Sequence, residues 1–212
     1  MKTLFLLLLA AGLAAGVRAA PLERDLGRGL TYLRVHALPA DLAAPEAAGH
    51  PFILDVRYAR GGAGDAAGLL AWLRQHASPR HPVFLLANTA TSAALLAPLN
   101  SPEAVTGLVI LGAAAPGFDP DIAVAVSAEE EQRAYDALER GAAVDSLVNA
   151  RVEKLRNDEA ALAKARLTDN SDNDNEPKLD ERPKPVPAPQ LIDPVLQRAV
   201  QLHRSLLALK RI

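Results

Sequence analysis

Four short apolar runs, bounded mainly by glycine, proline or asparagine, constrain the fold of this chain most strongly. Continuous apolar runs of this length are typical of strands that are covered on both faces. Segments with helical patterns separate them, and strands that alternate with helices predict a parallel sheet with right-handed crossovers. We therefore predict an α/β fold with a parallel sheet. The runs are Leu30–His36, Phe52–Arg57, Val83–Ala87 and Leu108–Leu111.

The segments between and after these runs predict helices and one further strand. Asp65–His76 carries leucine and tryptophan side chains at helical spacing, whereas Ser92–Leu99 is a shorter helix that we expect to end near Pro98. Ile122–Val126 predicts a last edge strand. These elements complete a sheet with flanking helices.

A capping box marks the next helix. Ser127 is followed by Glu130 at the spacing of reciprocal hydrogen bonds, and Gly141 is a natural residue just past a helix end. Another helical stretch is predicted over Val144–Leu167. Together with the strands, these helices place the α/β domain within residues 20–167.

The pattern of the first nineteen residues predicts an export signal. Lys2 precedes an apolar run, Leu4–Val17, which is shorter than the about 20 residues that a membrane span needs. This pattern is typical of a signal peptide, and Ala19 provides a small-residue cleavage site. We expect residues 1–19 to be removed and the mature protein to be periplasmic or secreted. An uncleaved N-terminal anchor is the alternative.

The composition changes after Leu167. Asp169–Glu176 is polar and acidic and Pro183–Pro189 is rich in proline, so residues 168–190 predict a linker. The acidic stretch lacks the glycine and the distal glutamate of a calcium loop. Asp193 and Pro194 then predict the start of a C-terminal helix over 191–212, which docks on the domain or on a partner.

Composition excludes several classes of function. The formal net charge, 23 − 25 = −2, argues against a nucleic-acid-binding protein, which usually carries a basic stripe. The absence of cysteine excludes disulfides, thiolate metal sites, a cysteine nucleophile and a lipid anchor on cysteine. The sequence contains no phosphate-binding glycine loop with lysine and no histidine cluster. We therefore predict no cofactor and no metal, and no membrane role beyond export; the oligomeric state is left open.

A resemblance to a known family rests on three motifs. Asp55-Val-Arg-Tyr-Ala-Arg-Gly-Gly62 resembles the Asp-Leu-Arg-x-Asn-x-Gly-Gly motif of the tail-specific (C-terminal processing) proteases. The Thr91-Ser92-Ala93 segment is similar to the Thr-x-Ser-Ala-x-Glu segment of that family, with Leu95 in place of the glutamate. Gly117–Val124 is similar to Gly-Ile-x-Pro-Asp-Ile-x-Val. The matches follow the family's order across about 30–141, and they imply a ClpP/crotonase-like core without a PDZ domain.

The resemblance implies roles for three residues. Ser92 falls at the position of the nucleophile, and Gly61 and Gly62 fall where backbone N–H groups would face the oxyanion or substrate. From the residues themselves, the favoured interpretation of Ser92 is a helix N-cap, and that of the two glycines is a turn before a helix.

The general base of the family is missing from its expected place. A serine hydroxyl needs a neighbouring base to become a nucleophile. The resemblance implies a lysine in a Gly-x-x-Thr-Phe-Gly-Lys-Gly segment, but here Ala113–Pro116 follows the fourth run, and no lysine lies between Lys2 and Lys154. His36 is the one histidine expected at the same sheet edge as Ser92.

These observations predict an exported, non-catalytic relative of a tail-specific serine protease that binds a peptide or protein partner. One alternative is a residually active serine-type peptidase that uses Ser92. Another is a cysteine-less rhodanese-like domain, suggested by Ile53-Leu-Asp-Val-Arg57, or a purely structural interaction domain.

Overall fold

A computed structural model describes residues 21–42, 49–99, 105–149 and 190–212. Within these residues the chain forms one six-stranded sheet with strands in sequence order, β1 to β6. β1 is antiparallel to β2, and every later pair is parallel. The predicted α/β class is therefore confirmed. The strands are β1 (Leu22–Asp25), β2 (Thr31–Arg34), β3 (Phe52–Asp55), β4 (Val83–Leu86), β5 (Leu108–Gly112) and β6 (Ile122–Ala123).

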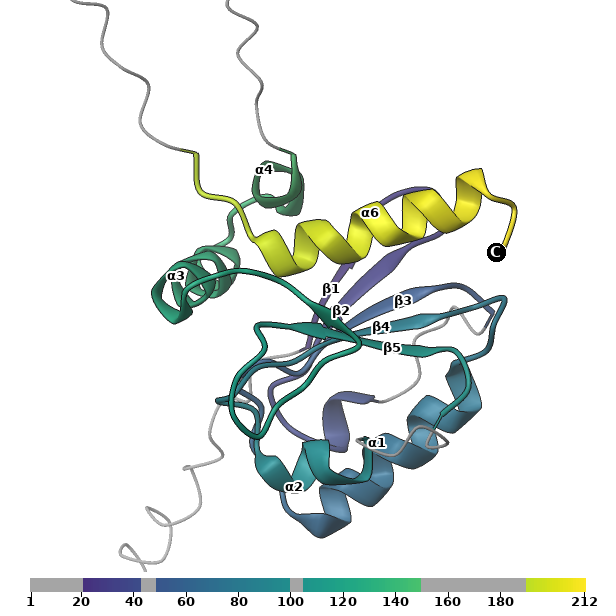
Figure 1. Ribbon diagram of the computed structural model, residues 1–212, viewed down its shortest axis with the longest axis vertical. Helices are drawn as coiled ribbons and strands as arrows, with labels where there is room; N and C mark the ends of the chain where they lie inside the picture. Colours follow the sequence, from purple (N-terminus) through teal and green to yellow (C-terminus); the bar gives the residue numbers. More distant parts are fainter. Residues whose placement is uncertain (1–20, 43–48, 100–104, 150–189) are drawn as a thin grey trace, which may run out of the picture.

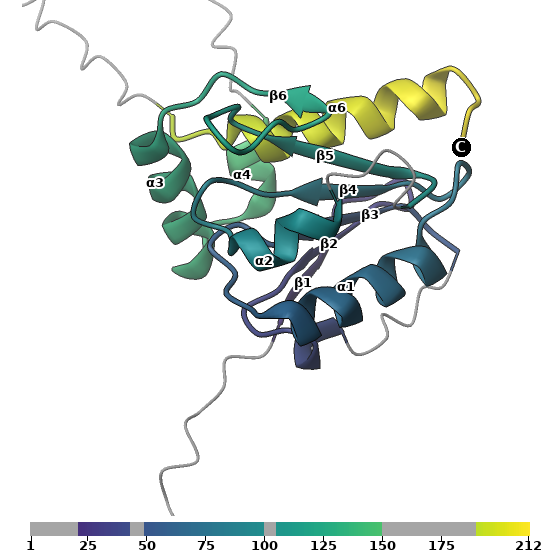
Figure 2. The same ribbon diagram turned by 60° about the horizontal axis from the view of Figure 1, so that its bottom comes forward.

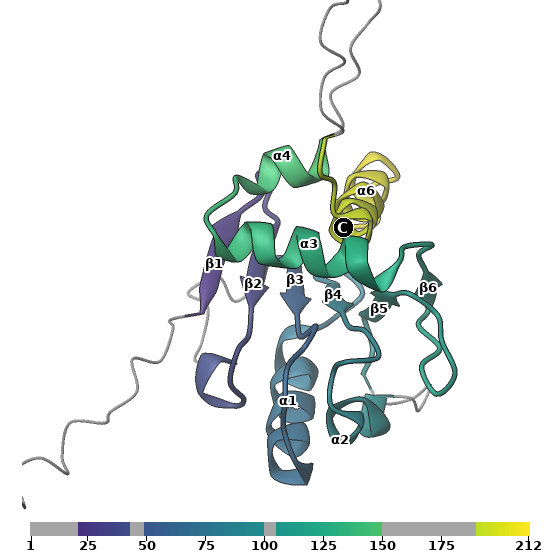
Figure 3. The same ribbon diagram turned by 90° about the vertical axis from the view of Figure 1, so that its left-hand side faces the viewer.

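Helices cover both faces of the sheet (Figures 1 and 2). α1 and α2 lie on one face, and α6 lies on the other, with α3 and α4 beside its N-terminal end (Figure 3). The α-helices are α1 (Ala63–His76), α2 (Ala93–Leu96), α3 (Ala128–Glu139), α4 (Val144–Val148) and α6 (Pro194–Ala208), and the short 3₁₀ helices are η1 (Ala40–Leu42) and η2 (Ala97–Leu99).

Alternate residues of the central strands supply two separate cores. Leu54 and Leu85 face α1 and α2, whereas Ile53 and Phe84 face α6 and α4. All four side chains are fully buried. This arrangement is the physical reason why the strands are continuously apolar, because neither face meets water.

The C-terminal helix packs on the sheet of its own chain. Its N-terminus is built as predicted: the Asp193 carboxylate accepts a hydrogen bond from Leu196 N–H at 3.0 Å, and Pro194 occupies the first turn. α6 contacts β4, β5 and α4. Val195, Leu196 and neighbouring apolar residues of α6 are part of the second core.

Several predicted boundaries need correction. β1 is not predicted by the sequence pattern, and β6 spans two residues rather than Ile122–Val126. α2 has only four residues and tightens into η2, where Pro98 lies. The helix predicted over Val144–Leu167 ends at Val148, because Asn149 has extended backbone. The remainder of that helix, the signal peptide and most of the linker lie outside the described residues.

Candidate functional site

The loops after β3 and β4 meet at the carboxyl edge of the sheet, where parallel α/β folds usually bind ligands. They bring together the residues that the resemblance singled out. The Ser92 hydroxyl donates to the Gly61 carbonyl at 2.7 Å, and Ser92 N–H donates to the Ala59 carbonyl at 3.0 Å. A Cβ at Gly61 would lie 2.8 Å from Leu95 Cδ2, so a larger residue at this position would require the Leu95 side chain to shift. Ser92 and the Gly61–Gly62 loop therefore lie together at this edge of the sheet.

The turn that carries Ser92 is held by a buried asparagine. Asn88 Oδ1 accepts hydrogen bonds from the backbone N–H groups of Ala90 and Thr91, each at 3.1 Å. The Thr91 hydroxyl donates to the Val56 carbonyl at 3.1 Å, which ties the turn to β3. Ser92 therefore sits on a rigid support rather than on a loose loop.

Among the residues that the structure describes, the Ser92 side chain neither caps α2 nor contacts a base. Ser92 occupies the N-cap position, but its hydroxyl makes no capping bond. Its partner is the Gly61 carbonyl, and a neutral amide oxygen does not take up a proton at ordinary pH. The hydroxyl is thus held by a hydrogen bond that does not activate it as a nucleophile.

One of the two amides that the resemblance directs at an oxyanion already has a partner. Gly62 N–H donates to Asp65 Oδ2 at 2.9 Å, in the first turn of α1. An aspartate at this place is favourable for the helix, because it faces the positive end of the helix dipole. The same carboxylate would repel an incoming oxyanion. Gly62 therefore contributes to the start of α1, as the alternative interpretation from sequence expected.

The candidate bases lie elsewhere. Lys210 is the one lysine among the described residues, and it follows α6 at the opposite end of the sheet (Figure 1). His36 Nε2 lies 3.3 Å from Glu139 Oε1 of α3. His50 and His81 line a cavity with Lys210. None of these side chains is paired with Ser92.

Beside Ser92, the carboxyl edge of the sheet contains a buried ionic cluster, which we name the Arg57 cluster: Asp55, Arg57, Asn88, Glu131 and Asp193. Arg57 Nε and Nη2 donate to the two Asp55 oxygens at 3.0 and 2.7 Å. Nη1 and Nη2 donate to the two Asp193 oxygens at 3.1 and 2.8 Å. The guanidinium thus makes two bidentate contacts, with strand β3 and with the N-terminus of α6.

Glu131 adds a third carboxylate to the Arg57 cluster. Its Oε2 accepts a hydrogen bond from Asn88 at 3.1 Å, and its Oε1 lies 3.6 Å from Arg57 Nη1 without a hydrogen-bond partner. Burial raises the pKa of Glu131, and the nearby Arg57 charge opposes but does not cancel this effect. For Asp55, burial also acts to raise the pKa, but Arg57, Arg34 and the Tyr32 hydrogen bond together outweigh it and hold that pKa below its ordinary value.

A second buried arginine extends the charged network toward α3. Arg34 Nε donates to the Tyr32 hydroxyl at 3.0 Å, and Tyr32 donates in turn to Asp55 at 2.6 Å. Arg34 also pairs with Glu139 at 2.9 Å and lies over the Tyr135 ring at 3.7 Å. These contacts connect β2 and β3 to α3 through charged side chains of the chain itself.

Sequence reasoning missed the Arg57 cluster as a unit. Asp55 and Arg57 appeared only as part of a family motif, and Asp193 appeared only as a helix cap. The sequence feature that could have indicated the cluster is Glu131, which lies on the buried face of α3 with Ala134 and Leu138. A charged residue on the apolar face of a helix calls for a buried partner.

Comparisons with known proteins give no match for this chain. The chain matches no family model, no curated protein and no solved structure. Across the described residues, no group of three His, Cys, Asp or Glu side chains is placed to hold a metal ion. In the same residues, no helix is long and apolar enough to span a membrane.

Proposed function

We propose that this protein is an exported, non-catalytic relative of the tail-specific proteases, with a ClpP/crotonase-like core that binds a peptide or protein partner. One observation carries the proposal. The Ser92 hydroxyl and the Gly62 amide, two of the three groups that the resemblance directs at a substrate, are hydrogen-bonded to the Gly61 carbonyl and to Asp65 instead.

The energetics of this arrangement oppose catalysis. Turnover requires a proton acceptor for the Ser92 hydroxyl and free N–H donors for the oxyanion. Here the hydroxyl faces a carbonyl, and the Gly62 amide makes a charge-assisted bond to a carboxylate. A substrate would have to break both contacts while its oxyanion approached Asp65.

The same loop supports a role in binding. Gly62, Ala63 and Gly64 are exposed at the start of α1, and no atom within 4 Å would meet a Cβ at Gly62 or Gly64. Exposed backbone without bulky side chains, here between β3 and α1, is a surface that an extended peptide can approach closely. We place the partner at this loop.

The enzymatic part of the proposal is tested with purified mature protein and an unfolded polypeptide substrate. We expect no cleavage and no labelling of Ser92 by a fluorophosphonate. The matched variants are Ser92→Ala, which removes a hydroxyl from the candidate site, and Ser205→Ala, which removes a hydroxyl from an exposed position on α6. Cleavage that Ser92→Ala abolishes and Ser205→Ala preserves would overturn the proposal. The alternative of a residually active peptidase would then be correct.

Export is tested separately by N-terminal sequencing of the mature protein. Cleavage after Ala19 leaves Ala20 as the first residue. Recovery of intact Met1 on the mature protein would contradict export through a cleaved signal peptide.

A further inference from the structure

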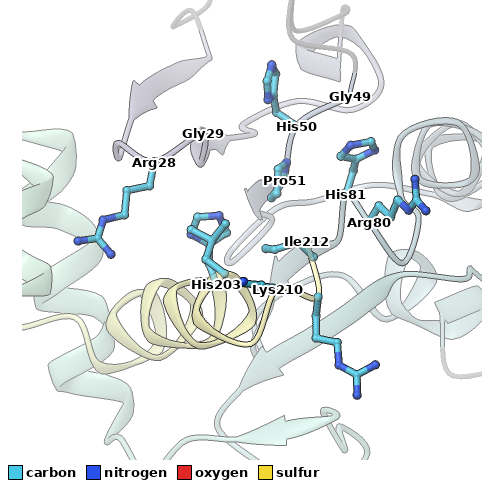
Figure 4. Close-up of a pocket in the computed structure, with 12 residues that line it drawn as sticks. Arg28, Gly29, Gly49, His50, Pro51, Arg80, His81, His203, Lys210 and Ile212 are labelled. Carbon is cyan, nitrogen blue, oxygen red and sulfur yellow. The ribbon is translucent and has the colours of Figure 1, made fainter.

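A cavity of about 490 Å³ lies at the opposite end of the sheet from Ser92 (Figure 4). It is formed where the loops that lead into β2, β3 and β4 meet the C-terminal end of α6. Its volume is in the range of ordinary small-molecule sites. The residues that line it are Arg28, Gly29, Gly49, His50, Pro51, Arg80, His81, His203, Leu207, Lys210, Arg211 and Ile212.

The side chains around the cavity are strongly basic. Arg28, Arg80, Lys210 and Arg211 line it together with three of the chain's five histidines, and no aspartate or glutamate is among the lining residues. The whole chain has a net charge of −2, so the basic charge is concentrated locally. The C-terminal dipole of α6 explains basic residues at its own end, but not those from the strand loops.

His203 is the buried polar group of this cavity. Its side chain is 2% exposed, and its Nε2 has no hydrogen-bond partner. Figure 4 shows the ring rising from α6 into the space between the loops that carry Arg28, His50 and His81. A buried ring nitrogen without a partner needs an explanation, and a ligand in the adjoining cavity supplies one.

The charges around His203 favour an anion. Burial lowers the pKa of His203, and the positive charges of Arg204 and Arg28 lower it further. An anion in the cavity would offset those charges and accept a hydrogen bond from the ring N–H. In Figure 4, the side chain of Arg28 extends away from the centre, so this arginine lies at the rim and attracts the ligand at longer range.

We propose that this cavity binds a small oxyanion with two or more negative charges, such as a phosphate ester or a polycarboxylic acid. His203 is the inner contact, Arg80 and Lys210 neutralise the charge, and Pro51 and Leu207 pack against the organic part. This inference does not depend on the proposed relation to proteases, because none of its residues lies in the Ser92 loop.

The test is isothermal titration of the full mature protein with pyrophosphate and with citrate, at constant ionic strength. We expect saturable binding of one anion per chain. The double variant Arg80→Gln, Lys210→Gln should weaken binding at least tenfold. The control, Arg140→Gln, removes an exposed arginine at the end of α3 and should leave the affinity unchanged.

His203→Phe tests the inner contact. It keeps an aromatic ring next to Phe84, whose centroid lies 6.5 Å from that of His203, and removes only the ring nitrogens. We expect a folded protein with at least fivefold weaker anion binding. If this variant does not fold, the surface double variant decides the question.

The relative affinities for pyrophosphate and citrate show which of the two classes of anion the cavity prefers. Tighter binding of pyrophosphate supports a phosphate ester, and tighter binding of citrate supports a polycarboxylic acid. Binding of neither ligand, or binding that both the double variant and Arg140→Gln reduce equally, would overturn the proposed site.

Discussion

Arg57 holds the buried charges of this protein together. Its guanidinium is fully buried and bridges Asp55 on β3 and Asp193 at the start of α6, although 136 residues separate Arg57 from Asp193. Removing one partner from such a group leaves uncompensated charge in a low-dielectric environment. The stability of the fold should therefore depend strongly on this one side chain.

We predict that Arg57→Met lowers the free energy of unfolding by about 3–5 kcal/mol. Asp55 and Asp193 would remain buried without their counter-charge. Urea unfolding followed by circular dichroism measures the effect. The control is Arg60→Met, which removes an exposed arginine from the same loop and should change stability by less than about 0.5 kcal/mol. Similar small losses in both variants would contradict the structural role of Arg57.

Glu131 gives a prediction about pH. A carboxylic acid with a raised pKa in the folded state binds more protons there than in the unfolded chain, so its contribution to stability is present at low pH and is lost as pH rises through the raised pKa. The pKa of Glu131 is raised by burial. We expect Glu131→Gln to gain stability relative to the parent as pH rises from 4 to 7.

The comparison requires urea unfolding of both proteins at several pH values. Gln retains an oxygen that can accept the Asn88 hydrogen bond, so the difference between the two curves isolates the titration of Glu131. Glu130→Gln, at an exposed position on α3, is the control; its pKa is lowered by the Ser127 hydroxyl and amide, which gives the opposite slope. A difference for Glu131→Gln that stays flat or falls with pH would contradict the assignment.

At this scale the sequence predicts contacts that follow from the topology of the sheet, but not the particular hydrogen-bond partner of each group. The proximity of Ser92 to Gly61 follows from two loops at one edge of a parallel sheet, and it could be foreseen. The hydrogen bond from Gly62 N–H to Asp65 could not be foreseen, because an acidic residue in the first turn of a helix is common. The contact between Arg57 and Asp193 carries no local sequence signal at all.

At the scale of elements, α6 is attached through its first turn. Asp193 has two roles: it caps the helix through Leu196 N–H and it pairs with Arg57. By contrast, Ser127 caps α3 at an exposed position through Glu130 N–H at 3.2 Å. The two caps therefore differ in burial and in coupling to charge.

We expect Ser127→Ala to lower the free energy of unfolding by about 1 kcal/mol, the usual loss for an N-cap. Asp193→Ala should cost about 3 kcal/mol or more, because it also removes a buried partner of Arg57. Asp193→Asn retains a capping oxygen and should fall between the two. Equal losses for Ser127→Ala and Asp193→Ala in thermal or urea unfolding would show that the Arg57 contact adds nothing.

The elements that the sequence predicts are those with a strong local pattern. The apolar runs of β2 to β5, the periodicity of α1 and α6 and the capping box of α3 all appear in the structure. β1 was missed because Leu22–Asp25 has only one apolar residue, and its pairing with β2 depends on the turn through Gly27 and Gly29, both with positive φ. The helix predicted from Val144 is interrupted at Asn149, whose extended backbone helical propensity does not reveal, and 150–167 lie outside the described residues.

At the scale of the whole molecule, strands from the middle of the sequence and the C-terminal helix complete one core. Phe84, Leu86 and Leu111 on the sheet are covered by Val195 and Leu196 of α6, and all five side chains are fully buried. The face opposite is closed by α1 and α2, which lie between strands in the sequence (Figure 3). The sequence indicates a docking helix but not its docking site, because that choice depends on which sheet face the earlier crossovers leave open.

Truncation tests whether α6 is an integral part of the fold. A chain of residues 20–189 exposes the apolar face of the sheet and leaves Arg57 with only Asp55 as a bidentate partner. We expect it to lose its cooperative unfolding transition and to bind a hydrophobic dye such as ANS, as expanded states with exposed cores do.

The matched control is a chain of residues 20–208, which lacks Leu209, Lys210, Arg211 and Ile212 but retains all of α6. Leu209 is 69% exposed, so the core remains covered and the transition should stay cooperative. Because Lys210 and Arg211 line the basic cavity, this control should also bind pyrophosphate or citrate more weakly than the parent. A cooperative, dye-free chain of residues 20–189 would mean that α6 is an appendage. In that case the sheet would have to satisfy Arg57 and cover Phe84 by other means.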